Sequence, residues 1–150
     1  MSPAKRAWLR AGLVCLAVLV LDQVAKALVE DELSIGEQVD VLGPLGLTLA
    51  HNSGVAFGLA SGGEALLIVF AIAALAVVGG LMARDPLRPG MWLAAGLVAG
   101  GALGNLVDRL RVGHVTDYVE VGSWPPFNIA DVAITAGVVI FAWTLVREQS

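Results

Sequence analysis

Charged side chains are scarce in this sequence. Only 15% of its 150 residues are Asp, Glu, Lys or Arg, whereas soluble proteins average about 25%. Apolar residues make up 57% of the chain, and its mean hydropathy is +0.81. This composition excludes a water-soluble domain and indicates one compact membrane-embedded unit. Basic residues do not cluster with aromatic ones, so binding to nucleic acid is excluded as well.

Cysteine is nearly absent too. Cys15 is the only one, which excludes an internal disulfide and a thiolate metal cluster, and we expect it to be a small buried apolar residue. The two histidines, His51 and His114, are isolated in the sequence without a second ligand nearby, so no metal site is predicted. A Gly-x-Ser-x-Gly elbow and a Ser/Lys pattern are also missing, which disfavours a serine nucleophile.

Long apolar runs, in contrast, are abundant. We place four membrane spans at about residues 8–29, 65–83, 90–107 and 127–146. The first run resembles a signal peptide, but Asp22 and Lys26 are out of place before a cleavage site, so we expect a retained helix. Gly96, Gly100 and Gly104 recur at four-residue spacing in the third run, which predicts close helix packing.

Two polar segments, residues 30–64 and 108–126, are interpreted as loops on one side of the membrane. Within the first, residues 39–50 alternate in polarity and break at Gly43-Pro44, which predicts short strands or a hairpin. The predicted fold is therefore an all-α membrane bundle of four transmembrane helices. It forms a single domain over residues 1–150, with a small extracytoplasmic β platform between helices one and two.

The basic residues predict the orientation of these spans. Six Lys and Arg side chains lie at the two termini and in the turn at residues 84–89. The two opposite loops hold only Arg109 and Arg111. The positive-inside rule then places both termini in the cytoplasm and both polar loops outside.

Residues 105–131, between two of these spans, are unusually rich in ionisable side chains, which by default indicates function at a membrane. Asp117 and Asp131 flank a loop stiffened by Pro125-Pro126. If that loop folds back, the two carboxylates can share one proton and catalyse hydrolysis by acid–base chemistry. Two plainer alternatives stay open: Asp131 in a first helical turn is a common cap, and Asp117 in a loop could be merely solvated.

Other polar residues have both a structural and a functional interpretation. Asp22 and Lys26, spaced i, i+4, form either a local ion pair or a brace for the site, for instance by pairing with Arg109 or a loop backbone. Asp108 next to Arg109 favours a structural ion pair over catalysis. Asn52, which precedes helix two, either satisfies backbone groups or holds a peptide substrate by hydrogen bonds.

Taken in order, these residues resemble the lipoprotein signal peptidase family, also called signal peptidase II. Each motif is weak alone, but together, and at these places among the four spans, they are specific. The motifs extend from Asp22 to Asp131, and Val55 departs from the smaller residue that many members carry. The motifs are Asp22-Gln23-x-x-Lys26, Asn52-x-Gly54-x-Ala56-Phe57, Gly104-Asn105-x-x-Asp108-Arg109, Asp117-Tyr118 and Phe127-Asn128-x-Ala130-Asp131.

The resemblance implies an intramembrane aspartic endopeptidase that uses no metal or cofactor, with Asp117 and Asp131 as the catalytic dyad. Its substrate would be a prolipoprotein whose cysteine bears diacylglycerol, cut just before that cysteine. We expect a monomer among the lipids of the bacterial cytoplasmic (inner) membrane, with its site near the outer leaflet. The residues that would shape the site or bind substrate are Asn52, Gly54, Asn105, Arg109, Asn128 and Ala130, and those that would support the structure are Asp22, Lys26 and Asp108.

Two other classes of protein compete with this interpretation. A small transporter or proton conductor would use Asp22, Asp117 and Asp131 as relay groups, but it predicts ionisable residues through the depth of the membrane. Here the interiors of helices two and three are uncharged, and the motif residues gather at one face. A structural or assembly protein would tolerate replacement of Asn52, Asp117 and Asp131 one at a time.

Overall fold

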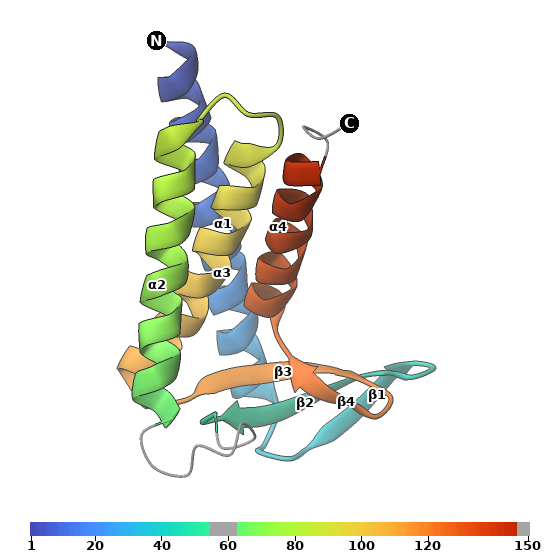
Figure 1. Cartoon of the computed structure of the whole chain (residues 1–150). Coiled ribbons are helices and arrows are strands. Elements are labelled where there is room, and N and C mark those ends of the chain that lie inside the picture. The colour runs from blue at the N-terminus through green and yellow to red at the C-terminus, as the bar shows by residue number, and fades with distance from the viewer. Residues whose placement is uncertain (55–62, 147–150) are drawn as a thin grey trace.

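The computed structural model describes residues 1–54 and 63–146, and within them it has four helices and four strands. The helices lie side by side in a bundle, and the strands form a sheet at one end of it, which we call the sheet end (Figure 1). Both chain termini lie at the opposite end. In chain order the elements are α1 (Pro3–Glu32), β1 (Gln38–Leu42), β2 (Leu45–Asn52), α2 (Gly63–Arg84), α3 (Met91–Val112), β3 (Val115–Val121), β4 (Trp124–Phe127) and α4 (Ile129–Val146).

Helix α3 is the centre of the bundle, because it packs against each of the other three helices. Its glycines permit this. A Cβ added to Gly96 would lie 2.7 Å from the Ala11 carbonyl oxygen, and one added to Gly100 would lie 2.8 Å from that of Cys15. The predicted glycine face is therefore confirmed: α1 crosses α3 at backbone contact distance, as small residues allow between membrane helices.

Three helices are long and apolar enough to cross a membrane among the residues that the structure describes: Pro3–Glu32, Ala65–Arg84 and Met91–Val112. The apolar part of α4, Ile129–Thr144, is shorter. Large apolar side chains point outward along the bundle; Leu13, Phe70 and Val139 are all more than half exposed. Such surfaces fit a lipid surrounding, where apolar side chains need not be buried in protein.

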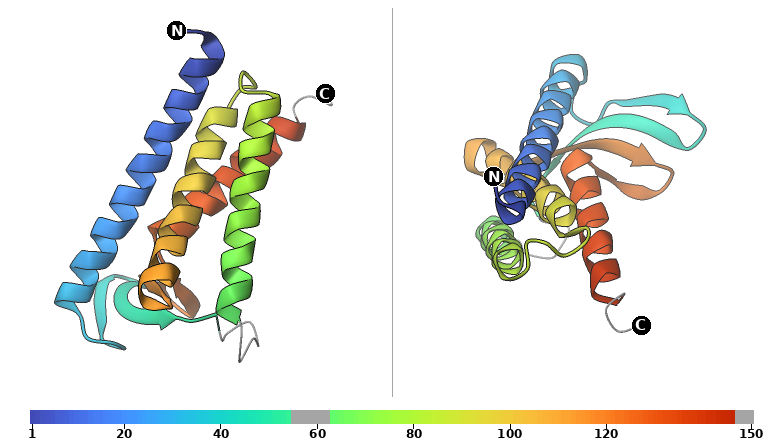
Figure 2. Two further views of the ribbon diagram at one scale, coloured as in Figure 1. Left: turned by 90° about the vertical axis from the view of Figure 1, so that its left-hand side faces the viewer. Right: turned by 90° about the horizontal axis from the view of Figure 1, so that it is seen from above.

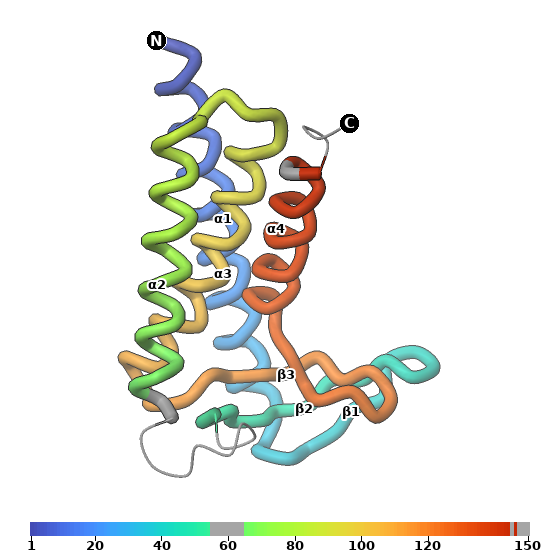
Figure 3. Tube along the Cα trace, viewed as in Figure 1, coloured from blue at the N-terminus to red at the C-terminus, as the bar shows by residue number. Residues whose placement is uncertain are grey.

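The four strands form one antiparallel sheet in the order β1-β2-β3-β4. The predicted hairpin at residues 39–50 is confirmed as β1 and β2. The β platform, however, is not built between helices one and two alone, because β3 and β4 come from the segment between α3 and α4. Pairing of β2 with β3 places these distant segments side by side (Figure 3). Viewed along the helices, the sheet projects to one side of the bundle (Figure 2).

The predicted loop at residues 108–126 is the main correction to the fold. Helix α3 continues to Val112, where Gly113 ends it in the left-handed conformation, and the remainder is mostly strand. Strand β3 pairs with β2, a partner far away in the sequence, so local patterns do not show it. Pro125 and Pro126 lie within β4, which sits at the edge of the sheet, where a proline without an N–H is tolerated.

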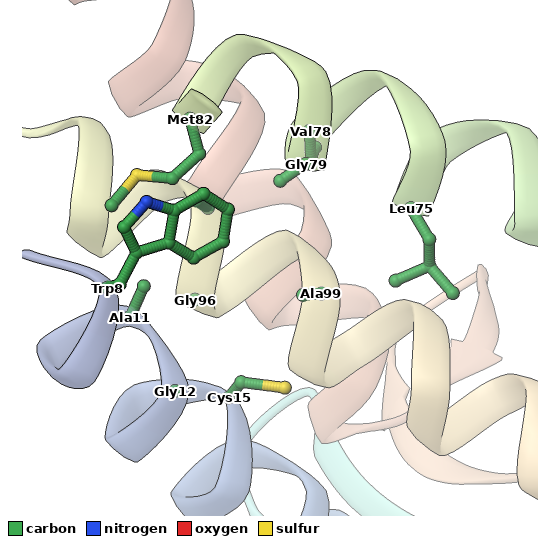
Figure 4. A pocket seen from close by; sticks show the side chains of 11 residues that line it. Trp8, Ala11, Gly12, Cys15, Leu75, Val78, Gly79, Met82, Gly96 and Ala99 are labelled. Atoms are coloured by element: carbon green, nitrogen blue, oxygen red, sulfur yellow. The ribbon is translucent and has the colours of Figure 1, made fainter. Parts of the chain in front are cut away.

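The bundle also has an apolar pocket between α1, α2 and α3, with Trp8 and Met82 at one end and Leu75 at the other (Figure 4). Cys15, expected to be a small buried apolar residue, lines this pocket and is only half-buried. Among the residues that the structure describes, those lining this pocket are all uncharged.

Candidate active site

Asp117 and Asp131 come together where β3 meets the start of α4. Asp117 lies in the middle of β3, and Asp131 is the third residue of α4. Asn128 links them: its side-chain Nδ2 donates to Asp117 Oδ1 at 2.7 Å, while its backbone N–H donates to Asp131 Oδ2 at 3.3 Å. The two carboxylates are therefore close enough to be held by one residue, as the sequence predicted.

Two further asparagines complete the set of donors around these carboxylates. Asn52, at the end of β2, donates from Nδ2 to Asp117 Oδ2 at 2.9 Å. Asn105, on α3, donates from Nδ2 to Asp131 Oδ1 at 2.8 Å. Each of the four carboxylate oxygens thus accepts one N–H from an asparagine. Donors of this kind stabilise the ionised form of a carboxylate.

Burial acts against ionisation of Asp117, which exposes only 3% of its surface. Burial raises the pKa of Asp117 to about 6, and the neighbouring Asp131 carboxylate adds to this rise. The hydrogen bonds from Asn52 and Asn128 and the charge of Lys26 oppose it. A carboxyl group whose pKa lies near 6 exchanges its proton readily close to neutral pH, which suits a general acid or base.

The capping interpretation of Asp131 is confirmed, and the catalytic role stays a prediction. Asn128 is the residue just before α4, and its Oδ1 accepts the backbone N–H of Asp131 at 2.9 Å. Asp131 in turn accepts the backbone N–H of Asn128. This reciprocal arrangement is a capping box. The cap holds the Asp131 carboxylate with one oxygen toward Asn128 and leaves the other toward Asn105.

A buried ion cluster lies behind the carboxylates. Lys26 Nζ is 2.7 Å from Asp22 and 2.6 Å from Asp108, and it donates to Asn105 Oδ1 at 3.1 Å. Asp22 Oδ1 accepts the backbone N–H of Ala130 at 2.9 Å. The predicted i, i+4 ion pair between Asp22 and Lys26 is therefore present. Asp22 also binds a backbone N–H at the start of α4, as the alternative interpretation of a brace for the site expected. The salt bridge of Asp108 is made with Lys26, from another helix.

The remaining predicted site residues lie around this centre. Arg109 donates from Nη1 to the Asn105 carbonyl at 3.3 Å. Gly54 has a positive φ of 78° and donates its N–H to Asn52 Oδ1, which orients that side chain. Ala130 is fully buried beside Gly101 and Gly104 of α3, and a Cβ added to Gly101 would clash with the Ala130 carbonyl oxygen. Val55, Ala56 and Phe57 of the second motif lie outside the described residues.

Sequence reasoning missed three residues that hold this arrangement. Gln23 donates to Asp108 Oδ1 at 2.8 Å and to the Gly104 carbonyl at 3.3 Å. Thr116 donates its N–H to Asp108, and its hydroxyl donates to Glu30 of α1. Gln23 stood within the first motif and could have been chosen on that ground. Glu30 and Thr116 are 86 positions apart, so no local pattern connects them.

The two histidines are not isolated in space. His51 of β2 and His114, just before β3, stack with ring centroids 3.8 Å apart, because β2 pairs with β3. Within residues 1–54 and 63–146, no group of three His, Cys, Asp or Glu side chains is arranged to hold a metal ion.

Comparisons with known proteins agree on one family. The sequence model of signal peptidase (SPase) II matches residues 14–147. The lipoprotein signal peptidase of Moorella thermoacetica is 39% identical, over 89% of this chain and 90% of its own. That of Pseudomonas aeruginosa is 42% identical, over 91% and 87%. A bacterial membrane enzyme solved by the in meso method at 2.3 Å resolution is 31% identical with a TM-score of 0.85, covering 93% of this chain and 89% of that one.

These matches cover most of the chain, including all of the motifs on which the resemblance rested, and they confirm it. The solved enzyme has the same overall fold, so the likeness extends from sequence to structure. The chain belongs to the signal peptidase II family of aspartic proteases.

Proposed function

We propose that this protein removes the signal peptide from diacylglyceryl-modified prolipoproteins, cutting just before the lipidated cysteine with Asp117 and Asp131 as the catalytic dyad. One observation carries the proposal: Asn128 binds both carboxylates, so two aspartates from separate elements share one site. The relatives named lipoprotein signal peptidase support the choice of substrate.

The proposed mechanism needs one ionised and one protonated carboxyl group. The ionised member takes a proton from water, and the resulting hydroxide attacks the peptide carbonyl carbon. The protonated member polarises the carbonyl and then gives its proton to the departing amine. Because the two groups are coupled, the pair has two apparent pKa values, and the roles exchange through the cycle. Water attacks directly, so no acyl-enzyme forms.

The position of the dyad supports a lipid-anchored substrate. It lies where the helices meet the sheet, at the end of the bundle opposite both termini (Figure 1). We place that end at the outer leaflet of the bacterial cytoplasmic membrane, following the excess of basic residues near the termini. A diacylglyceryl cysteine presents its scissile bond at this depth. Asn52, Arg109 and Asn128 are placed to hold the substrate backbone, and one chain supplies the whole site, so we propose a monomer.

The decisive experiment is cleavage of a diacylglyceryl-modified prolipoprotein by the purified protein in detergent. Asp117→Asn and Asp131→Asn keep the side-chain shape and remove the carboxylate. We expect the wild type to cut before the lipidated cysteine, and both folded variants to lose at least about a thousandfold in rate. A wild type that does not cut, or a variant with near-normal activity, would contradict the substrate or the dyad, respectively.

A further inference from the structure

The asparagines around the dyad all turn the same end toward it. Asn52 and Asn128 present their NH₂ groups to Asp117, and Asn105 presents its own to Asp131. A side-chain amide has a donor end and an acceptor end, so whatever its oxygen binds decides which end faces the carboxylate. The groups that bind the three asparagine side-chain oxygens therefore determine whether donors or acceptors face the two carboxylates.

Two of these oxygens are fixed by the backbone. The N–H of Gly54 donates to Asn52 Oδ1 at 3.0 Å, and the N–H of Asp131 donates to Asn128 Oδ1 at 2.9 Å. These bonds follow from the turn at Gly54 and from the cap of α4. Their direction is thus built into the fold, independently of any other side chain.

Asn105 is different, because side chains hold its oxygen. Lys26 Nζ donates to Asn105 Oδ1 at 3.1 Å, and Asn128 Nδ2 donates to the same atom at 3.1 Å. The Lys26 ammonium is a donor with no acceptor capacity, so it cannot face the NH₂ end of an amide. Lys26 is also buried between Asp22 and Asp108, which prevents it from moving away.

We propose that Lys26 is a positioning residue for the reaction: by binding Asn105 Oδ1, it turns the Asn105 NH₂ group toward Asp131, so that donors alone face the dyad. The inference rests on the proposed function and gives Lys26 a role beyond supporting the fold. Without the ammonium, Asn105 Oδ1 keeps only the hydrogen bond from Asn128 Nδ2, a group that also donates to Asp117 and to the Thr116 carbonyl. The Asn105 amide is then held less firmly and can turn its oxygen toward Asp131. An acceptor in that place makes the pair retain its protons to higher pH.

Lys26 can affect the dyad in two ways, through its positive charge and through the hydrogen bond that it donates to Asn105 Oδ1. The experiment has to separate these two effects. Lys26 lies between Asp22 and Asp108, so the three side chains together carry a formal charge of minus one. Removing Lys26 alone would leave two buried carboxylates without their cation, which destabilises a fold strongly. The charged or titratable side chains near the dyad from each packed element are Asp22 and Lys26 on α1, Asp108 and Arg109 on α3, and Tyr118 on β3.

A charge-matched double variant makes this separation. Lys26→Met combined with Asp108→Asn keeps the formal charge of the cluster at minus one and removes the ammonium. The wild type is therefore its charge-matched reference. Asp108→Asn alone retains the ammonium but changes the formal charge of the cluster to zero, so it serves only to show the effect of losing that carboxylate. Lys26→Arg keeps the donor as well as the charge. The measurement is the pH profile of kcat for cleavage of the diacylglyceryl-modified prolipoprotein, with the folded fraction of each variant measured separately.

We expect the acidic limb of the double variant to lie about one pH unit or more above that of the wild type, which has the same cluster charge. Lys26→Arg should keep the wild-type limb. Asn105→Leu, which leaves the ion cluster intact, should show a similar shift, and adding it to the double variant should shift the limb no further, because both changes act through one amide. Dividing kcat by the folded fraction measured at each pH removes any contribution of acid unfolding to the position of the limb.

A double variant with the same limb as the wild type, and with activity reduced only in proportion to its folded fraction, overturns the proposal and leaves Lys26 a structural residue. An unshifted limb in Asn105→Leu overturns it too, even if the double variant does not fold. A wild type that fails to cleave refutes the proposed function, and this inference with it. These outcomes separate failure of the positioning role from failure of the assigned reaction.

Discussion

Asp117 ionises in surroundings that favour its neutral form. Its pKa of about 6 lies above the ordinary value of 3.8. Between these two values the folded chain binds the Asp117 proton and the unfolded chain does not. The free energy of unfolding therefore falls as pH rises through this range and stays lower above about 6. The shift corresponds to roughly 3 kcal/mol at neutral pH, a stability cost borne by a group that the proposed reaction needs.

Asp117→Asn removes this ionisation. We expect the difference in unfolding free energy between variant and wild type to move in favour of the variant by roughly 3 kcal/mol from pH 4 to pH 8. Any penalty from an amide NH₂ that faces Asn52 or Asn128 is the same at both pH values and cancels. Denaturant or thermal unfolding in detergent at the two pH values measures the change. An equal difference at both would mean that Asp117 ionises without cost in the fold.

Asn128 combines two roles that substitution can separate. It caps α4 through Oδ1, and it donates to Asp117 through Nδ2. Asn128→Ser keeps a good capping group and removes the donor, whereas Asn128→Ala removes both. We expect both variants to lose most of their activity, and the alanine variant to melt lower than the serine variant by the equivalent of about 1 kcal/mol. Full activity in Asn128→Ser would show that the donated hydrogen bond is dispensable.

At the level of single residues, the sequence predicted that Asp117 and Asp131 come together, but it did not predict the residues that support them. Asn128 and Asp131 are spaced i, i+3 at a helix start, so their capping box was within reach of local reasoning. The partners of Lys26 could not be found by local reasoning. Asp108 and Asn105 come from another helix, and spacing within α1 could suggest only the pair with Asp22. Contacts between distant segments depend on packing that no local pattern encodes.

At the level of elements, the close contact of α1 with α3 depends on Gly100. A Cβ there would lie 2.7 Å from Val18 Cβ and 2.8 Å from the Cys15 carbonyl oxygen, so α1 has to move for it to fit. We expect Gly100→Ala to lower stability by about 1–3 kcal/mol. Gly79 on α2 has no atom within 4 Å of such a Cβ, so Gly79→Ala is the matched control and should not destabilise. Equal melting temperatures for the two variants would contradict the contact.

The strands show which elements a sequence can reveal. Strands β1 and β2 are neighbours joined by a short turn, and the alternation of residues 39–50 with Gly43-Pro44 was enough to predict them. Strand β3 also alternates, but its partner β2 lies about 70 positions earlier, so the same signal was interpreted as a loop. β4 contains Pro125 and Pro126, which argue against a strand except at an edge. Pairing over such distances places Asp117 beside Asn52.

At the scale of the whole molecule, the bundle separates its two ends by charge and chemistry. The two aspartates and the sheet occupy one end, and the start of α1 and the 84–89 turn, which carry five Lys and Arg residues, lie at the other (Figure 1). If the terminal end is cytoplasmic, the dyad opens toward the outer surface. A lipid-anchored substrate exported across the membrane then reaches it without recrossing the bilayer. The function proposed here therefore depends on the orientation of the bundle.

Cysteine labelling tests that orientation directly, because the chain has only one cysteine to remove. In a Cys15→Ala background, Asp40→Cys places a thiol on exposed strand β1, and Ser2→Cys places one at the exposed start of α1. We expect a membrane-impermeant maleimide to label Asp40→Cys in intact spheroplasts and Ser2→Cys only after lysis. The reverse pattern would put the dyad on the cytoplasmic side, where a prolipoprotein anchored at the outer leaflet could not present its scissile bond. Labelling of both positions before lysis would rule out a fixed orientation with the termini inside.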